Sequence, residues 1–321
     1  MRNAVVACAT FAFVLAGCNW GWQSAHAPGA SLSIQFASRP QTSWMNGSRE
    51  PGGRAYLASF YTASIVVYDR RGVVLGAIHD PNYPVSLSVD RGHNLWLIDT
   101  RTAKILEYAR DATKPKATLT DPETHAVDVT RCPGGAVYVS NSGVRSGRRE
   151  NVEVYASGST SPTGQLHAGH HDNPVVGLSI TCDAAGTVFW LVEDNGIHFE
   201  IFAFPHGMQT SAYSFGVPLK QYSVCGIKAD PAGNLLVCDR ESQTITEYSE
   251  QGEPTGRSIT TYVLGSLAVS ADGRVVGGYD DSNFNGASLW TFPGGELRRQ
   301  YRAPSSGTLQ NVTGFALDPD E

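Results

Sequence analysis

Short runs of apolar residues recur along the chain, and each run ends in an aromatic side chain. The runs are too short for helices and are rich in β-branched and aromatic residues, which is typical of buried strands. They occupy residues 65–68, 105–108, 152–155, 201–204, 245–248 and 289–292. Their closing aromatics are 40, 47, 49, 44 and 44 residues apart, and a period of this size predicts units that stack or close into a ring.

A second apolar strand precedes each run, at residues 56–59, 95–99, 137–141, 188–192, 235–239 and 275–279. Before it lie a tight turn and a first strand, as in residues 226–234. There Pro231 presets φ, Asp230 can bond its own backbone, and Gly233 accepts a positive φ. A weaker fourth strand follows, as at residues 73–76. Four short antiparallel strands in each period indicate the blade of a β-propeller.

The two ends of the chain each carry part of one such unit. Residues 314–321 have the pattern of a first strand and its turn, whereas residues 51–57 resume with a second strand. Pairing the two parts makes a composite blade, which closes the ring and removes an exposed edge strand. We therefore predict an all-β fold over residues 51–321: a six-bladed β-propeller of four-stranded antiparallel blades, closed by pairing of the N- and C-terminal strands.

Two phrases of the repeat carry a family resemblance. Residues 229–239 and residues 151–160 resemble the six-bladed propellers of the NHL-repeat, gluconolactonase-like and streptogramin-lyase-like superfamily. The resemblance covers roughly residues 50–321. It implies the fold and not a single function, because propellers host many chemistries and many binding roles.

Composition narrows the class of partner. The chain has 24 Lys and Arg against 30 Asp and Glu, a net charge of −6, which argues against nucleic acid as a partner. Apolar residues make up 41% and aromatic residues 10%, too much of both for a disordered chain.

The N-terminal segment has the features of an export signal. Arg2 is followed by an uncharged apolar stretch at residues 4–15, which is shorter than the roughly 20 residues of a membrane-spanning helix. Residues 15–18 end in Cys18 and resemble the bacterial lipobox, which implies cleavage after Gly17 and lipidation of Cys18; an ordinary signal cut near residues 25–27 is the alternative.

The predicted organisation follows from that signal. Residues 1–17 are the lipoprotein signal peptide, residues 18–50 the lipidated Cys and a flexible tether, and residues 51–321 the propeller. We expect an exported bacterial lipoprotein anchored to a membrane through Cys18. Asn19, where an Asp commonly marks inner-membrane retention, favours the outer membrane, on its periplasmic side or at the cell surface.

Four cysteines remain outside the signal and the lipidation site: Cys132, Cys182, Cys225 and Cys238. An even number in an exported protein allows two disulfides. Cys132 and Cys182 occupy nearly the same position in successive repeats, and Cys225 and Cys238 lie on the two strands of one hairpin. These placements favour the pairs 132–182 and 225–238, with buried free thiols as the alternative.

Candidate ligand-binding residues fall in the loops that propellers gather on one face, around the central channel. The loops that lead into the first strands carry His79, Asp80, His125, His170 and His171, and the loops after the second strands carry Asp99, Glu193, Asp239 and Asp280. Neutral imidazoles bind divalent cations, so His79 and His125 are the candidate metal ligands. The alternative for Asp99, Asp239 and Asp280 is turn capping, because they recur with the repeat. The alternative for His170 and His171 is an exposed polar loop.

Three functions fit these observations. The first is a lipid-anchored cell-envelope propeller that binds a protein, glycan or small ligand without catalysis and needs no cofactor. The second is a metal-dependent lactonase or lyase at the channel mouth. The streptogramin-lyase resemblance implies a His near a metal, and the gluconolactonase resemblance implies Glu, Asn and Asp around one; neither pattern transfers residue by residue. The third is a structural module of an envelope assembly. The sequence has no G-x-S-x-G, Walker or H-E-x-x-H motif.

Overall fold

The computed structural model describes residues 53–59, 62–79, 81–142, 150–168, 175–194, 198–220, 224–262, 265–280, 286–302 and 312–318. The predicted signal peptide and tether, the lipidation site Cys18, and the candidates Asp80, His170 and His171 lie outside these residues. Asp280 ends a strand, but its side chain is also outside the description.

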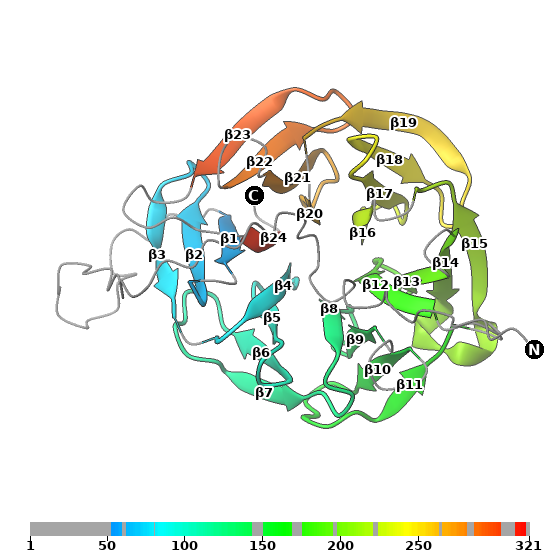
Figure 1. Cartoon of the computed structure of the whole chain (residues 1–321), viewed down its shortest axis with the longest axis horizontal. Helices are drawn as coiled ribbons and strands as arrows, with labels where there is room; N and C mark the ends of the chain where they lie inside the picture. The colour runs from blue at the N-terminus through cyan, green and yellow to red at the C-terminus, as the bar shows by residue number, and fades with distance from the viewer. Residues whose placement is uncertain are drawn as a thin grey trace, which may run out of the picture.

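Six four-stranded antiparallel sheets surround a central axis (Figure 1). Blade 1 consists of β24 (Val312–Leu317), β1 (Arg54–Ser59), β2 (Ser64–Asp69) and β3 (Val74–Ile78). Blade 2 consists of β4 (Pro84–Val89), β5 (Leu95–Asp99), β6 (Lys104–Tyr108) and β7 (Ala117–Thr120). Blade 3 consists of β8 (Ala126–Arg131), β9 (Val137–Asn141), β10 (Asn151–Tyr155) and β11 (Gly164–Leu166).

The other three blades have the same order. Blade 4 consists of β12 (Val175–Cys182), β13 (Val188–Asp194), β14 (His198–Phe204) and β15 (Tyr213–Val217). Blade 5 consists of β16 (Val224–Ala229), β17 (Leu235–Asp239), β18 (Thr244–Tyr248) and β19 (Pro254–Thr260). Blade 6 consists of β20 (Gly265–Val269), β21 (Val275–Asp280), β22 (Gly286–Thr291) and β23 (Leu297–Arg302). Two 3₁₀ turns, η1 (Pro205–Gly207) and η2 (Gln209–Ser211), precede β15. The predicted fold class is confirmed.

The predicted closure of the ring is also confirmed. β24, near the end of the chain, pairs antiparallel with β1, near its start, with Phe315 opposite Leu57 and Leu317 opposite Ala55. Figure 1 shows β24 as the innermost strand of the blade that contains β1, β2 and β3. Blade 1 is therefore the composite blade, and its inner strand cannot leave without opening the ring.

The core lies between the blades and not within one sheet. Each pair of neighbouring blades shares one apolar cluster, such as Trp96 and Ile98 of blade 2 with Val139 and Tyr155 of blade 3. The second strands are consequently buried on both faces, which explains why residues 95–98 read as a continuous apolar run without alternation.

All six first strands contain a β-bulge at the same position. In each first strand the register with the second strand shifts across one extra residue: between Pro84 and Ser86, Ala126 and Asp128, Gly177 and Ser179, Val224 and Gly226, Gly265 and Leu267, and Val312 and Gly314. A bulge bends a strand and re-aims its side chains. The residue after the bulge is thereby brought to an equivalent place on each inner strand.

The described residues contain two disulfides, and they are the pairs that the repeat positions favoured. Cys132, in the first turn of blade 3, is bonded to Cys182 of blade 4, with Cα atoms 5.5 Å apart. Cys225 and Cys238 are bonded within blade 5, with Cα atoms 5.2 Å apart. The first bridge links two blades, whereas the second fixes two strands of one sheet.

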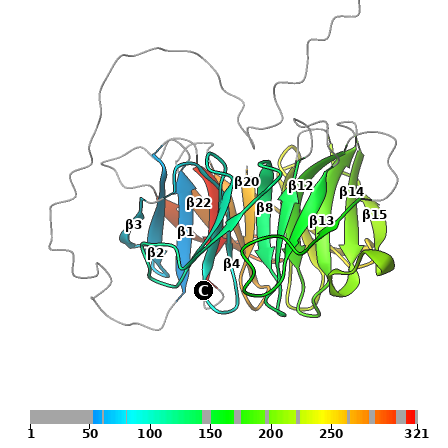
Figure 2. The ribbon, with the colours of Figure 1, turned by 90° about the horizontal axis from the view of Figure 1, so that it is seen from below.

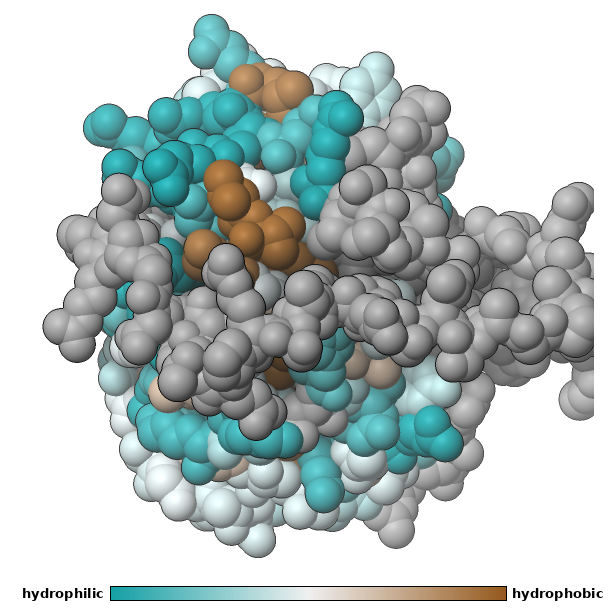
Figure 3. All heavy atoms as spheres, turned by 90° about the vertical axis from the view of Figure 1, so that its left-hand side faces the viewer, coloured by the Kyte–Doolittle hydropathy of each residue, from teal (hydrophilic) through white to brown (hydrophobic). Residues whose placement is uncertain are grey.

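On the side where β3 lies, an apolar patch interrupts the polar part of the described surface (Figure 3). Val73 and Val74, at the start of β3, are 54% and 39% exposed.

Candidate functional site

The loops that lead into the first strands and the loops after the second strands lie together, and we call this side of the ring the loop face. Ser142 N donates to His125 O at 3.1 Å, Thr100 N to Tyr83 O at 3.2 Å, and Thr261 N to Gln243 O at 2.7 Å. Each of these bonds joins one kind of loop to the other. Figure 2 shows the strands of all blades running between this face and the opposite one.

Five of the candidate residues are described on this face, at four of the blades. His79 lies in the loop that leads into β4 of blade 2, Asp99 ends β5 of the same blade, His125 precedes β8 of blade 3, Glu193 lies in β13 of blade 4, and Asp239 ends β17 of blade 5. The ring spreads them around its rim. Within the residues that the structure describes, no three His, Cys, Asp or Glu side chains form a group that could hold a metal ion.

The two aspartates fix loops of this face: Asp99 binds the loop that leads into β4, and Asp239 binds its own loop. The Asp99 carboxylate is buried and accepts hydrogen bonds from the backbone N–H of Asn82 at 3.1 Å and of Tyr83 at 3.2 Å. The Asp239 carboxylate accepts from the backbone N–H of Glu241 at 2.9 Å and of Ser242 at 3.3 Å. These are the contacts of loop capping.

The histidines differ in exposure. His79 is exposed, whereas His125 is half-buried and its Nδ1 lies 2.6 Å from Glu123 O. A carbonyl oxygen only accepts, so Nδ1 of His125 carries the proton and donates. In the neutral ring Nε2 is then the nitrogen with a lone pair.

Glu193 is the second buried acid among the candidates, after Asp99. It is 6% exposed, and burial raises the pKa of its carboxyl group. A raised pKa is a property that general acids use, but the other four described candidates stand on other blades.

A carboxylate that the sequence analysis missed lies on the inner wall of the ring. Asp128, directly after the bulge of β8, accepts hydrogen bonds from Ser86 Oγ of β4 at 2.5 Å and Ser179 Oγ of β12 at 2.8 Å. It also accepts from the backbone N–H of Val129 and Ile180, both at 2.9 Å. Asp128 thus links three successive first strands. Aligning the first strands, which places Ser86, Asp128 and Ser179 at one position, is the signal that could have found it.

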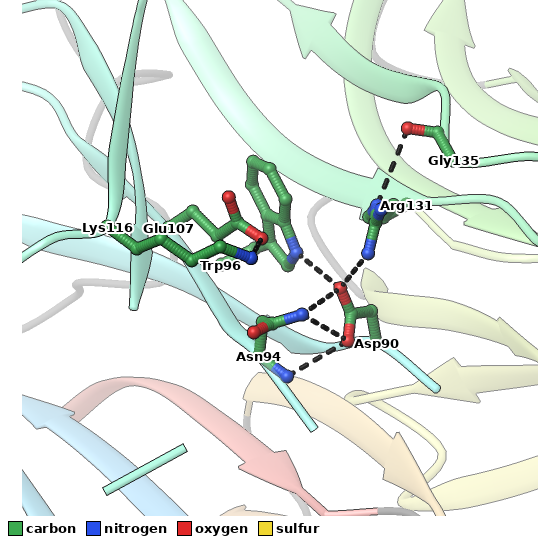
Figure 4. A network of polar contacts seen from close by, with 7 residues as sticks. All are labelled: Asp90, Asn94, Trp96, Glu107, Lys116, Arg131 and Gly135. Atoms are coloured by element: carbon green, nitrogen blue, oxygen red, sulfur yellow. Dashed lines mark hydrogen bonds and ion pairs between the residues drawn. The ribbon is translucent and has the colours of Figure 1, made fainter. Parts of the chain in front are cut away.

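A second missed network joins blades 2 and 3 on the face opposite the loop face (Figure 4). Asp90, 6% exposed, accepts from Trp96 Nε1 at 3.0 Å, from Asn94 N at 2.9 Å and from Arg131 of blade 3 at 2.6 Å. Burial alone would raise the pKa of Asp90, but these hydrogen bonds outweigh it and hold the pKa below its usual value. The network is a structural connection between blades.

Solved structures resemble this chain in fold. A chain from the crystal structure of a nidogen/laminin complex matches 83% of this chain and 98% of its own length, with a TM-score of 0.63 and 13% identity. The hydrazine synthase of Kuenenia stuttgartiensis matches 83% and 86%, with a TM-score of 0.58 and 11% identity. A streptogramin B lyase matches 82% and 75%, with a TM-score of 0.51 and 12% identity. No protein-family model and no curated protein matches the chain. The likeness shows a β-propeller, and at these identities it shows the fold alone.

Proposed function

We propose that the protein is a lipid-anchored cell-envelope β-propeller that acts as a non-catalytic binding or scaffold module for a protein, glycan or small ligand. Residues 1–17 would direct export, Cys18 would carry the lipid, and residues 18–50 would tether the ring to the membrane. None of the described helices has the length and apolar character of a membrane-spanning segment. The lipid is thus the proposed route of attachment.

One observation carries the non-catalytic part of the proposal. The Asp99 and Asp239 carboxylates accept hydrogen bonds from backbone N–H groups of the loop face, and the described candidates are spread over blades 2 to 5, with His79 and Asp99 at the same blade. A catalytic set needs an acid, a base or a nucleophile within hydrogen-bond reach of one another or of a shared reacting atom. A rigid rim with fixed loops is instead suited to presenting a surface to a partner.

The fold neighbours are consistent with either role. One neighbour comes from a complex of nidogen and laminin, and another is a lyase. The NHL-repeat, gluconolactonase-like and streptogramin-lyase-like superfamily, which residues 229–239 resemble, is the proposed family. For that superfamily the second candidate function is a metal-dependent lactonase or lyase that uses His79 and His125.

The experiment that separates the two functions is a turnover assay. The purified protein is stripped with chelator, reloaded separately with Ca²⁺, Mg²⁺, Mn²⁺ and Zn²⁺, and assayed against a lactone panel and against streptogramin B. The double variant with His79→Ala and His125→Ala is the comparison. We expect no metal-dependent turnover by either protein. Turnover by the wild type that the double variant loses would contradict the non-catalytic proposal.

A further inference from the structure

Blades 2 and 3 meet in a wedge that is apolar near its middle and polar toward the loop face. In the middle, Val139 of β9 and Tyr155 of β10 pack with Ile98 of blade 2. Side chains two residues apart on a strand share a face of the sheet. Toward the loop face, Val139 is therefore followed by Asn141 on β9, and Tyr155 by Glu153 and Asn151 on β10. We call Asn141, Asn151 and Glu153 the polar seam.

The polar seam is buried and its hydrogen bonding is incomplete. Asn141, Asn151 and Glu153 are 2%, 3% and 0% exposed. Asn141 and Asn151 are opposite each other in the register, and Asn151 Nδ2 donates to Glu153 Oε1 at 3.2 Å. Four polar atoms of the seam have no hydrogen-bond partner among the described residues: Asn141 Oδ1, Asn141 Nδ2, Asn151 Oδ1 and Glu153 Oε2. Buried polar atoms normally have a hydrogen-bond partner, so four such atoms on one face of blade 3 indicate a bound ligand.

Two other buried glutamates on third strands show what the polar seam lacks. Glu107 of β6 is paired with Lys116 Nζ at 3.0 Å, and Glu247 of β18 is paired with Arg257 at 2.6 Å. In both blades the cation comes from the start of the fourth strand or from within it. In blade 3, Glu153 lies on the strand face that is turned toward blade 2, and the neutral Gln165, its register partner on β11, donates to Glu153 Oε1 at 2.7 Å. Glu153 therefore has amide donors where the other two have a positive charge.

The surroundings of the polar seam add negative charge. Asp121 and Glu123 lie in the loop between blades 2 and 3, close enough for their charges to act on Glu153. Burial, followed by these two charges, raises the pKa of Glu153, against the hydrogen bonds from Gln165 and Asn151. Asp121 itself is occupied, because its two oxygens accept from the backbone N–H groups of Glu123, His125 and Ala126. A positive ligand would relieve the repulsion among these acids.

We propose that the polar seam binds a hard cation of the calcium class, with Glu153 Oε2 and the side-chain oxygens of Asn141 and Asn151 as protein ligands. Calcium takes carboxylate and amide oxygens together and completes its shell with water. The cation replaces the Lys or Arg that neutralises Glu107 and Glu247 in their blades. Bound there, it would hold the loop at residues 121–125 against blade 3. The proposal is independent of the proposed function, because binding or scaffolding needs no metal; the seam adjoins the loop that carries His125 and lies away from the candidates His79 and Asp239.

The test uses the purified full chain, stripped with chelator and titrated with CaCl₂. We expect one calcium ion per chain by calorimetry, and a saturable rise in Tm of about 5 °C when calcium reaches about 100 times its Kd. Glu153→Gln removes the charge and keeps the shape, and we expect it to weaken calcium binding at least tenfold. Glu247→Gln is the matched control, because Glu247 is already paired; its calcium affinity should equal that of the wild type.

A gain-of-charge variant keeps the test decisive if Glu153→Gln fails to fold. Gln165→Lys places a cation opposite Glu153 in the register of β10 and β11, where Gln165 already reaches Glu153 Oε1. We expect Gln165→Lys to raise Tm in chelator and to abolish the response to calcium. Wild-type protein that shows no saturable calcium binding would overturn the proposal, since the polar atoms would then be satisfied by water only. Calcium binding that is unchanged in Glu153→Gln and in Gln165→Lys would overturn it too, because the ion would bind elsewhere.

Discussion

Replacing Phe315 with Ala tests whether the last strand really closes the ring. Phe315 lies in β24, is completely buried, and packs with Leu57 of β1 and with Tyr301, whose ring centroid is 5.8 Å away. Truncating a buried Phe costs about 3–5 kcal/mol, from lost transfer free energy and from the cavity left behind. In a domain of this size about 2 °C of Tm is lost per kcal/mol, so we expect Phe315→Ala to lower Tm by about 8 °C.

The assay is urea unfolding and thermal unfolding followed by tryptophan fluorescence. Tyr262→Ala is the control, because Tyr262 is 60% exposed and its replacement should change the free energy of unfolding by less than about 0.5 kcal/mol. A strand this close to the end of a chain frays without cost unless it is packed. If Phe315→Ala behaved like Tyr262→Ala, the closure of the ring by β24 would be refuted.

Three further predictions concern the blades. The pKa of Asp90 is lowered in the folded state, so the contribution of Asp90 to stability is present above the unfolded pKa of about 3.9 and is lost as pH falls through the folded pKa. Asp90→Asn should therefore lower the free energy of unfolding at pH 7 and flatten the acid side of a curve of Tm against pH. A curve identical to that of the wild type would contradict this prediction. Removing the Cys132–Cys182 bridge, whose cysteines are 50 residues apart, should lower the free energy of unfolding by about 4 kcal/mol in the chain-entropy model, against about 3 kcal/mol for the 13-residue Cys225–Cys238 loop. Urea unfolding of the two double Cys→Ser variants measures both losses. A larger loss for the Cys225–Cys238 variant would contradict the prediction. A Cβ on Gly277 of β21 would lie 2.9 Å from Ser288 O and 3.0 Å from the Phe315 ring, so Gly277→Ala should destabilise the protein by about 1–3 kcal/mol. Gly134→Ala is the control, because no atom lies within 4 Å of its Cβ and no destabilisation is expected. Equal urea midpoints for the two variants would refute the close packing around Gly277.

The blades could be predicted from the sequence because their strands are buried on both faces. Such strands appear as apolar runs, and the aromatic that closes each run packs against the preceding blade, as Tyr155 of blade 3 does with blade 2. The composite blade could be predicted for the same reason, since residues 314–317 and 54–57 each repeat a known part of the pattern.

The site could not be predicted to the same depth, because its chemistry depends on neighbours that the period does not specify. Every blade has polar residues in its loops, so the recurrence that revealed the fold also spread the candidates from His79 to Asp239 around the rim. Asp128 acquires its role only where three first strands lie side by side with their bulges aligned. Glu153 receives a neutral amide donor from Gln165, whereas Glu107 receives the ammonium group of Lys116, and the repeat does not specify which of the two a blade has.

The proposed function depends most on the lipid at Cys18. Its direct test is to express the full chain in bacteria fed with labelled palmitate, as wild type, as Cys18→Ser, and as the matched control Cys8→Ser, in which the cysteine lost lies inside the proposed signal peptide. We predict labelled protein in the membrane fraction for the wild type and for Cys8→Ser, and no label for Cys18→Ser. Label that is absent from the wild type, or that persists in Cys18→Ser, would contradict the lipid-anchored propeller.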